Sequence, residues 1–312
     1  MTKFRLIQPS TRAFVREARR VPGFSAFDFV HAYVYGRWTR LYLSMGMGTH
    51  PLAKRLRPLI NWIGGRMVSQ AGGKDGVRFE DTYHGKVVPL AAARELVSIK
   101  EDINLGDLEH VIPYQRAREI VLQQPDHLAV MECACRAARE HPCQPMDVCL
   151  IVGEPFASFV VEHQPEKSRR ITPAEAQQIL EAEDRRGHVH HAFFKDAMFG
   201  RFYAICNCCA CCCGALQSHL SGTPMLAASG YVARVDAERC RGCRKCEKVC
   251  KFGALSIDGS LAQVDESKCM GCGVCLAQCN LDAIQLERAP WRGEPLEIGE
   301  LMKQAIGESI NQ

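Results

Sequence analysis

Apolar positions near the start of the chain follow a helical period. In the stretch FSAFDFVHAYVYGRWTRLY, residues 24–42, large side chains recur at steps of three and four residues, at Phe24, Phe27, His31, Val34, Trp38 and Leu41. This spacing predicts an amphipathic helix with an aromatic stripe, and Arg37 and Arg40 lie beside the stripe. Such a helix suits a membrane surface, the groove of a partner protein, or packing against the rest of the chain. All three uses stay open.

Terminal signals indicate a second helix in ITPAEAQQILEAEDRRG. Thr172 suits the N-cap, Pro173 the first helical position, Glu175 completes a capping box, and Gly187 suits the C-terminal cap. We therefore expect a helix from about 173 to 186. It separates two groups of cysteines, which can meet only through tertiary folding.

The C-terminal part alternates short apolar strands with cysteine loops, and does so twice. The segments YVARV and ALSI in one half correspond to LAQV and AIQL in the other. One offset of 29 residues turns Cys240, Cys243, Cys246 and Cys250 into Cys269, Cys272, Cys275 and Cys279. Gly242 and Gly271 follow the same offset.

The repeated spacing C-x2-C-x2-C-x3-C resembles that of bacterial-type 2(4Fe-4S) ferredoxins over residues 228–288. The resemblance implies crossed ligation, in which Cys240, Cys243 and Cys246 share a cluster with Cys279, and Cys269, Cys272 and Cys275 share one with Cys250. It also implies that Gly242 and Gly271 let the backbone approach the clusters. Lys251 and Asn280 stand where the family usually has proline. Structural zinc is the alternative.

Ten further cysteines lie upstream, in CACRAAREHPCQPMDVC and CNCCACCC, at Cys133, Cys135, Cys143, Cys149, Cys206, Cys208, Cys209, Cys211, Cys212 and Cys213. Neighbouring side chains diverge along an extended chain, so Cys208 and Cys209 cannot both face one cubane comfortably. We expect the second segment to serve two sites, one on each side, with the first segment supplying the other ligands. Additional iron–sulfur clusters, zinc and redox-active thiols are the alternatives.

Several short segments add a second resemblance. CACR, PMDVCL, ITPAEAQQIL, GHVH and ICNCC together look like a poorly characterised group of 4Fe-4S binding proteins over residues 110–288. This resemblance implies electron transfer but no established substrate. We expect His188, His190 and His191 to face solvent or be satisfied in the core, because cysteine is abundant enough to supply the ligands.

Composition and charge bear on location and partners. The chain begins without the apolar core of a signal peptide, and no uncharged apolar run reaches the roughly 18 residues of a membrane span. We expect reduced thiols and a cytoplasmic protein, in contact at most with the inner face of the membrane. Residues 1–70 carry a net charge of +10 and the remainder −6, which favours an anionic surface or partner. No nucleic-acid motif or G-x-G-x-x-G fingerprint is present, so we expect no nucleic acid, flavin or NAD(P).

These patterns predict an α+β protein of four parts. They are a basic aromatic helical segment ending in a linker (1–84, linker 71–84), a central mixed Cys-rich domain (85–227), a pseudo-twofold ferredoxin-type domain (228–288) and a tail with a short helix (289–312). The expected function is electron relay between redox partner proteins through two C-terminal 4Fe-4S clusters and one or two more. The alternative is a reductase that uses the central cluster or thiols on a small substrate such as a disulfide. No catalytic side chain is assigned.

Overall fold

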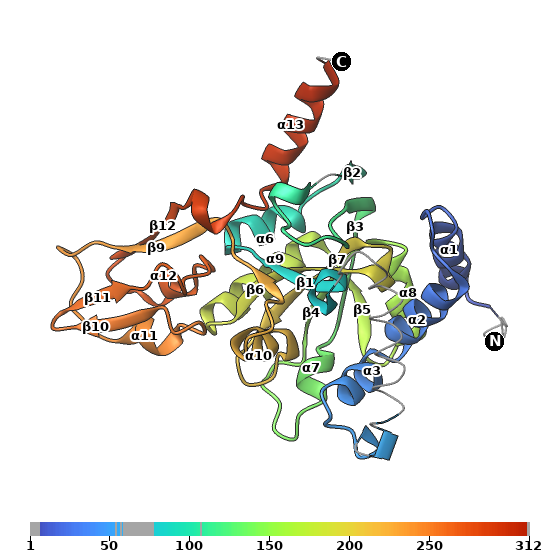
Figure 1. Ribbon diagram of the computed structural model, residues 1–312, viewed down its shortest axis with the longest axis horizontal. Coiled ribbons are helices and arrows are strands. Elements are labelled where there is room, and N and C mark those ends of the chain that lie inside the picture. Colours follow the sequence, from blue (N-terminus) through green and yellow to red (C-terminus); the bar gives the residue numbers. More distant parts are fainter. Residues whose placement is uncertain (1–6, 54, 57, 59–77, 107, 311–312) are drawn as a thin grey trace.

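A mixed eight-stranded sheet forms the centre of the molecule (Figure 1). The computed structural model describes residues 7–310 except 54, 57, 59–77 and 107. Strands follow the order β2-β3-β4-β7-β6-β1-β8, and β5 pairs with β3. Their bounds are β1 (Tyr83–Val87), β2 (Ile103–Leu105), β3 (Ile120–Glu132), β4 (Asp147–Glu154), β5 (Ser168–Ile171), β6 (Val189–Lys195), β7 (Arg201–Cys208) and β8 (Leu226–Ala227). Strands β1 and β8 pair in parallel, and the other pairs are antiparallel.

Alternate residues of the central strands face two different cores. Phe194 of β6 and Ile205 of β7 lie in one core, together with side chains of α6 (Leu90–Leu96), α9 (Pro173–Arg185) and α13 (Ile298–Ile310). Phe193 of β6 and Cys208 of β7 lie in the other, together with side chains of α1 (Pro9–Ala18), α2 (Ala26–Arg37) and α8 (Phe156–His163). The two-residue period of a strand therefore places β7 cysteines on the face that the N-terminal helices cover.

The N-terminal helices are part of the fold. Phe14 of α1 is buried, and its ring centre lies 4.9 Å from that of Phe159 and 4.6 Å from that of Phe199. Glu17 accepts a hydrogen bond from Arg201 Nη1 at 3.2 Å. The inner face of the N-terminal segment therefore packs against the rest of the chain, which is one of the three uses that the sequence left open.

The predicted helix over residues 24–42 is two helices, and half of its stripe is exposed, whereas Phe24, His31 and Val34 are half-buried. The helix breaks at Trp38 (φ −125°, ψ 45°) into α2 and α3 (Thr39–Gly46). Gly36 faces inward, where an added Cβ would lie 2.9 Å from Phe159. The stripe residues Phe27, Trp38 and Leu41 are nearly half exposed instead (46%, 48% and 47%). Close contact through glycine, rather than the aromatic stripe, therefore selects the buried face.

Helix α9 confirms the prediction from its terminal signals. The Thr172 side chain accepts a hydrogen bond from the Glu175 backbone N–H at 3.2 Å. The Glu175 carboxylate pairs with Arg169 Nη1 at 2.6 Å rather than closing the capping box. Gly187 follows with a φ of +77°.

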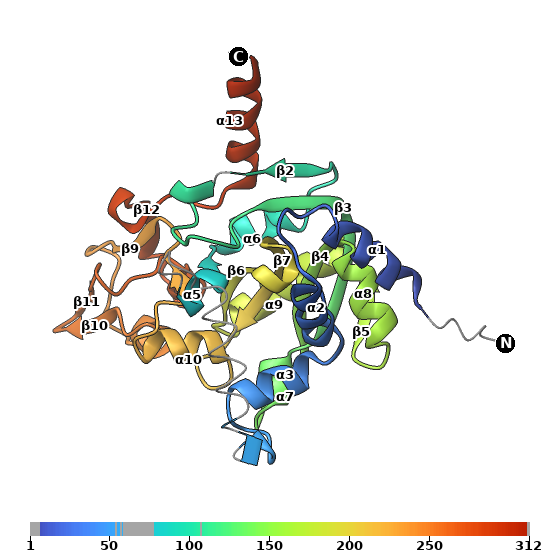
Figure 2. The same ribbon diagram turned by 45° about the vertical axis from the view of Figure 1, so that its right-hand side comes forward.

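The C-terminal domain shows the predicted repeat. Strand β9 (Tyr231–Val235) pairs with β12 (Ile284–Arg288), and β10 (Leu255–Asp258) pairs with β11 (Leu261–Val264). Short helices α11 (Lys245–Val249) and α12 (Val274–Gln278) follow the cysteine loops. Figures 1 and 2 place this domain and the N-terminal helices on opposite sides of the central sheet.

Two predicted boundaries shift. Residues 71–77 of the predicted linker lie outside the described residues, but α5 (Phe79–Thr82) and β1 follow at once, so the boundary at 84 falls inside a strand. Beyond residue 288, Leu296, Ile298 and Leu301 are buried in the core that contains Phe194. The tail therefore packs on the central unit, because its apolar residues fill that core. Within the described part of the chain, no helix is long and apolar enough to cross a bilayer.

Candidate metal centres

Four cysteines of the C-terminal domain surround one small cavity. The cavity has a volume of about 20 Å³, and its walls include Cys250, Cys269, Cys272 and Cys275. Cys250 belongs to the first half of the repeat and the other three to the second. This grouping is the crossed set that the resemblance implies for one of the two clusters.

Backbone amides point at three of the eight cysteine sulfurs in this domain. Ala254 N–H donates to Cys250 Sγ at 3.3 Å, and Ala283 N–H, 29 residues later, donates to Cys279 Sγ at 3.3 Å. Ala233 N–H donates to Cys269 Sγ at 3.4 Å. Donors in these positions stabilise negative charge on sulfur, which is what a cluster thiolate requires.

Gly242 and Gly271 are also required by contacts with neighbouring backbone. Both have positive φ, +60° and +64°. An added Cβ at Gly271 would lie 2.2 Å from the Tyr231 carbonyl oxygen, and one at Gly242 would lie 2.9 Å from the Ser260 carbonyl oxygen. The contact that excludes a side chain is thus with the backbone of a neighbouring segment.

The first cysteine loop is more open to solvent than the second. Cys243 is exposed and Cys240 half-buried, whereas Cys269 and Cys275 are buried. Burial raises the pKa of Cys246, beside the thiols of Cys243 and Cys240. Cys279 packs on the same small core as Cys240.

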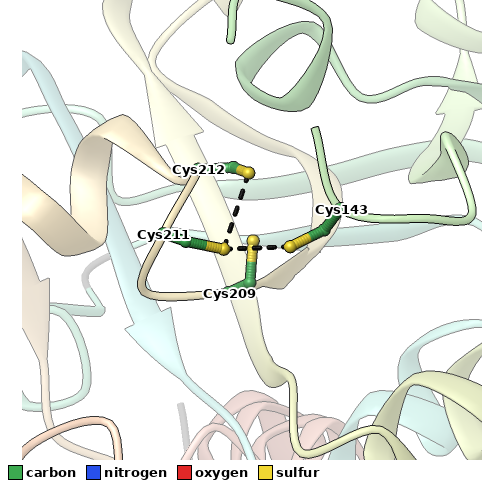
Figure 3. A group of neighbouring side chains, drawn as sticks. All are labelled: Cys143, Cys209, Cys211 and Cys212. Carbon is green, nitrogen blue, oxygen red and sulfur yellow. Dashed lines mark hydrogen bonds between the residues drawn. The ribbon is translucent and has the colours of Figure 1, made fainter. Parts of the chain in front are cut away.

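A four-thiol group lies at the outer side of the central unit (Figure 3). We use this name for Cys143, Cys209, Cys211 and Cys212, whose sulfurs all lie within 4.8 Å of one another. Cys143 Sγ is 2.9 Å from Cys211 Sγ, which is 3.6 Å from Cys212 Sγ. Cys143 comes from the loop before β4 and the other three from the loop after β7. Four thiols suit either a 4Fe-4S cluster or a zinc ion.

The other six cysteines of the central unit form a second group, the six-thiol chamber, which comprises Cys133, Cys135, Cys149, Cys206, Cys208 and Cys213. Strand order brings them together, since β3, β4 and β7 are neighbours, Cys133 follows β3 directly, and Cys149 and Cys206 lie within β4 and β7. Cys208 ends β7, and Cys213 is the N-cap of α10 (Gly214–Leu220). Cys135 lies on α7 (Ala134–Ala137), directly after β3.

Sulfur contacts link all six thiols. Hydrogen bonds with Cys135 and Cys149 hold the pKa of the Cys133 thiol well below its usual range. Hydrogen bonds with Cys133 and Cys213 raise the pKa of Cys135, and hydrogen bonds with Cys133 and Cys206 raise that of Cys149. Cys213 Sγ lies 3.1 Å from Cys208 Sγ.

At the end of β7, adjacent cysteines divide between the two groups as the extended-chain argument predicts, whereas Cys211 and Cys212, in the turn that follows, belong to the same group. Cys208 belongs to the six-thiol chamber and Cys209 to the four-thiol group, and the neighbours Cys213 and Cys212 divide in the same way. The sequence did not indicate that the first segment would contribute three cysteines to one group and only Cys143 to the other.

Aromatic side chains close the six-thiol chamber on its other side. A cavity of about 70 Å³ lies between the thiols and a wall that includes Tyr35, Tyr83 and Tyr203. Tyr35 Oη and Tyr203 Oη are 2.6 Å apart and buried. Lys195 Nζ lies 4.7 Å from the Tyr35 ring centre and 4.6 Å from that of Tyr83, and burial lowers the pKa of Lys195 to about 8.

A buried arginine fixes the cysteine segments. Arg136 donates to Glu183 Oε2 at 2.7 Å, to the Asn207 carbonyl at 3.1 Å and to the Pro145 carbonyl. It therefore ties the segment after β3 to the end of β7 and to the loop before β4. Its charge is balanced by the Glu183 carboxylate.

The three histidines are buried, and two have a hydrogen-bond partner for Nδ1, although Nε2 of His190 has none among the described residues. His188 Nδ1 lies 2.6 Å from Glu183 Oε2, and His190 Nδ1 lies 2.6 Å from Asn207 Oδ1. His191 differs, because neither ring nitrogen has a well-formed hydrogen bond to the described residues, and burial lowers its pKa to about 3. It lies opposite Cys206 in the β6–β7 register. No sequence signal separated it from its neighbours.

Comparison with known proteins supports one part of this arrangement. A family model described as a 4Fe-4S dicluster domain matches residues 239–283. No curated protein and no solved structure matches the chain. The match indicates 4Fe-4S cluster binding in the C-terminal domain, and the eight cysteines there fit it. For the central unit, no matching relative supports the resemblance over residues 110–288. The two thiol groups of this unit are therefore defined by the geometry of the structure.

Proposed function

We propose that this iron–sulfur protein carries electrons inward, from the exposed C-terminal cluster site through the second one to the central thiols. The supporting observation is that Cys250 and Cys272 pack against the same core that contains Cys208 and Cys213. The Cys250 site thus lies on the side of the C-terminal domain that meets the central unit. The Cys243 site, at the exposed end, is where a partner can approach.

Tight packing of the two units supports this route. Gln278 Nε2 of the C-terminal domain donates to the Arg185 carbonyl of the central unit at 3.0 Å. At Gly187 an added Cβ would lie 2.5 Å from Val249 Cγ2. The end of α9 therefore contacts α11 and α12 closely, which favours a fixed distance between the redox centres.

The exposed loop is basic, which points to an acidic redox partner. Arg241, Arg244, Lys245 and Lys248 are all exposed around Cys243. Complementary charge accelerates the encounter of two proteins and is screened by salt. We expect electron transfer from a small acidic donor protein to slow as salt is raised.

A stopped-flow experiment tests the relay. In a variant with Cys240, Cys243 and Cys246 changed to Ser, we expect a reduced acidic ferredoxin to reduce the central centres at least about tenfold more slowly, a change of roughly 1.4 kcal/mol in the barrier. The matched control is Arg169→Gln, an exposed basic residue of the central unit. An unchanged rate in the triple variant would show that electrons enter elsewhere.

Metal analysis under anaerobic conditions tests the cofactor content. With about four irons per cubane, two C-terminal clusters and one in the four-thiol group require at least about 12 irons per chain. About eight irons with stoichiometric zinc would assign zinc to the central unit and overturn the relay beyond the C-terminal domain.

Reduction of a small substrate such as a disulfide is the second candidate. It is favoured by the cavity beside the six-thiol chamber, which is lined by tyrosine and phenylalanine side chains. Turnover of a disulfide by the isolated protein with an artificial electron donor would support it. If the protein is reduced but turns over no disulfide, this second candidate is contradicted and electron relay is the function that is left.

The outer face of the N-terminal helices is a candidate docking surface for an anionic membrane. Phe27, Val30, Trp38, Leu41, Leu52 and Leu56 are exposed there. Beside Trp38 and Leu41 runs a groove lined by Arg37, Arg40 and Lys167. We expect binding to vesicles of anionic lipid that weakens with salt, and Trp38→Ala with Leu41→Ala should abolish it. Equal binding to neutral vesicles would contradict an electrostatic contribution.

A further inference from the structure

The C-terminal domain provides an internal standard for the size of a cubane site. Its cavity of about 20 Å³ is lined by four cysteines, in a domain whose family binds 4Fe-4S clusters. The cavity of the six-thiol chamber measures about 70 Å³ and is lined by the six cysteines of the chamber and by Cys209 of the four-thiol group. Both the room and the number of thiols therefore exceed what the cubane site of the same protein provides.

The six sulfurs form one continuous series. Cys206 contacts Cys149, Cys149 contacts Cys133, and Cys133 contacts Cys135. The series continues from Cys135 to Cys213 and ends at Cys208. No member is set apart as a spare thiol, whereas a 4Fe-4S cluster takes four cysteines.

Neutralising six thiolates requires positive charge inside the chamber. Arg136, the buried guanidinium next to Cys135, is already paired with Glu183 at 2.7 Å. Thiolates in apolar surroundings are costly unless their charge is compensated, so six cysteines that bind as thiolates would need metal ions in the chamber.

A hydrogen-bond donor is left over in the chamber wall. The hydroxyls of Tyr35 and Tyr203 bond to each other at 2.6 Å, and neither has another hydrogen bond to the described residues. Two hydroxyls have two O–H donors, and their mutual bond uses one. A buried donor without a partner costs roughly 1–3 kcal/mol. The second O–H therefore suits an acceptor in the cavity, such as a sulfur atom.

We propose that the six-thiol chamber holds a single iron–sulfur cluster of more than four irons, bound by all six cysteines and hydrogen-bonded by the Tyr35–Tyr203 pair. Such a group would be the inner end of the electron route. The inference rests on the proposed relay only for the source of the electrons. The iron content of the cluster does not depend on how fast the cluster is reduced.

Substitutions at the two ends of the sulfur series test whether one group occupies the chamber. Cys206→Ser and Cys208→Ser are made in the full chain and compared anaerobically by EPR and Mössbauer spectroscopy. One shared cluster predicts that both variants change the same signal. If either variant leaves the spectra and iron content as in the wild type, a cubane with spare thiols occupies the chamber and the proposal fails.

Iron counting tests the size of the group. Cys133→Ala with Cys135→Ala should remove more than about four irons per chain, the content of a cubane. The matched control, Cys143→Ala with Cys211→Ala in the four-thiol group, should remove about four irons or one zinc ion. A loss of four irons or fewer from the chamber variant would overturn the proposal. If the double variant does not fold, the two serine variants decide alone. Failure of the relay would alter reduction rates and leave these counts unchanged.

Discussion

The C-terminal domain and the six-thiol chamber assemble cysteine sites in opposite ways. In the C-terminal domain, three cysteines of each half lie within seven residues, and one cavity joins Cys250 of the first half to Cys269, Cys272 and Cys275 of the second. In the chamber, cysteines from residues 133–149 and 206–213 meet because β3, β4 and β7 are neighbours in the sheet. The spacing of cysteines along the chain indicates the first kind of site, whereas the second kind forms only when the sheet folds.

The two regions also differ in how they are covered. Cys243 of the C-terminal domain is exposed. The cavity of the chamber is lined by Phe14 of α1, by Tyr35 of α2 and by five further tyrosine and phenylalanine side chains from other parts of the chain. A site that exchanges electrons with partners needs an accessible edge. A site enclosed by aromatic rings is protected from solvent, and its properties depend on the residues that seal it.

The largest expected effect comes from removing a buried side chain that covers the chamber but not the C-terminal domain. Phe14→Ala should destabilise the protein by about 3–5 kcal/mol, because a buried phenylalanine is replaced by a cavity. The chamber should lose its metal while the C-terminal clusters keep their EPR signals. Phe27→Ala, at a side chain that is 46% exposed, is the control and should change neither. Equal loss of all clusters in Phe14→Ala would show that the two regions are not independent.

The next prediction concerns crossed ligation between the two halves of the C-terminal domain. Cys250→Ser should perturb the cluster of Cys269, Cys272 and Cys275, because these four residues line one cavity. Cys279→Ser should perturb the other cluster. EPR of the two variants distinguishes the signals. If Cys250→Ser alters only the cluster of Cys240 and its loop, the crossing is wrong.

A smaller effect concerns the tyrosine pair. Tyr35→Phe should lower the reduction potential of the chamber by about 60 mV, because a hydrogen bond to a charged group is worth roughly 1.5 kcal/mol and a one-electron step of about 59 mV corresponds to that energy. The C-terminal potentials should stay constant. Tyr42→Phe is the matched control, since its hydroxyl pairs with His31 at 2.8 Å. Potentiometric titration followed by EPR measures all of these shifts.

The last expected effect is on the pH dependence of stability. Burial lowers the pKa of Lys195 from 10.5 to about 8. Between these values the unfolded chain binds the proton more tightly than the folded one, so stability rises with pH, at most by about 1.4 kcal/mol per pH unit. In Lys195→Met this rise should be smaller. Unfolding temperatures of both proteins from pH 8 to 10 check it, and parallel curves would contradict the assignment.

Local signals determined the parts of this protein whose structure is local. The capping residue Thr172 and Pro173 fixed the start of α9, and the cysteine offset of 29 residues fixed the repeat of β9 to β12. The alternation of an extended chain was enough to send Cys208 and Cys209 to different groups. These outcomes depend on covalent geometry and hydrogen bonds between near neighbours, which the sequence specifies directly.

Only the tertiary structure decided the rest. The aromatic stripe left open whether it would face a membrane, a partner or the rest of the chain; close packing of Gly36 on Phe159 leaves Trp38 exposed. The six-to-four division of the central cysteines depends on which strands are neighbours, and strand order is set by packing across the whole sheet. The unpartnered nitrogens of His191 and the leftover O–H of the Tyr35–Tyr203 pair likewise exist only once distant segments meet. Contacts between residues more than a hundred positions apart leave no periodic trace in a sequence, because periodicity records only the local backbone.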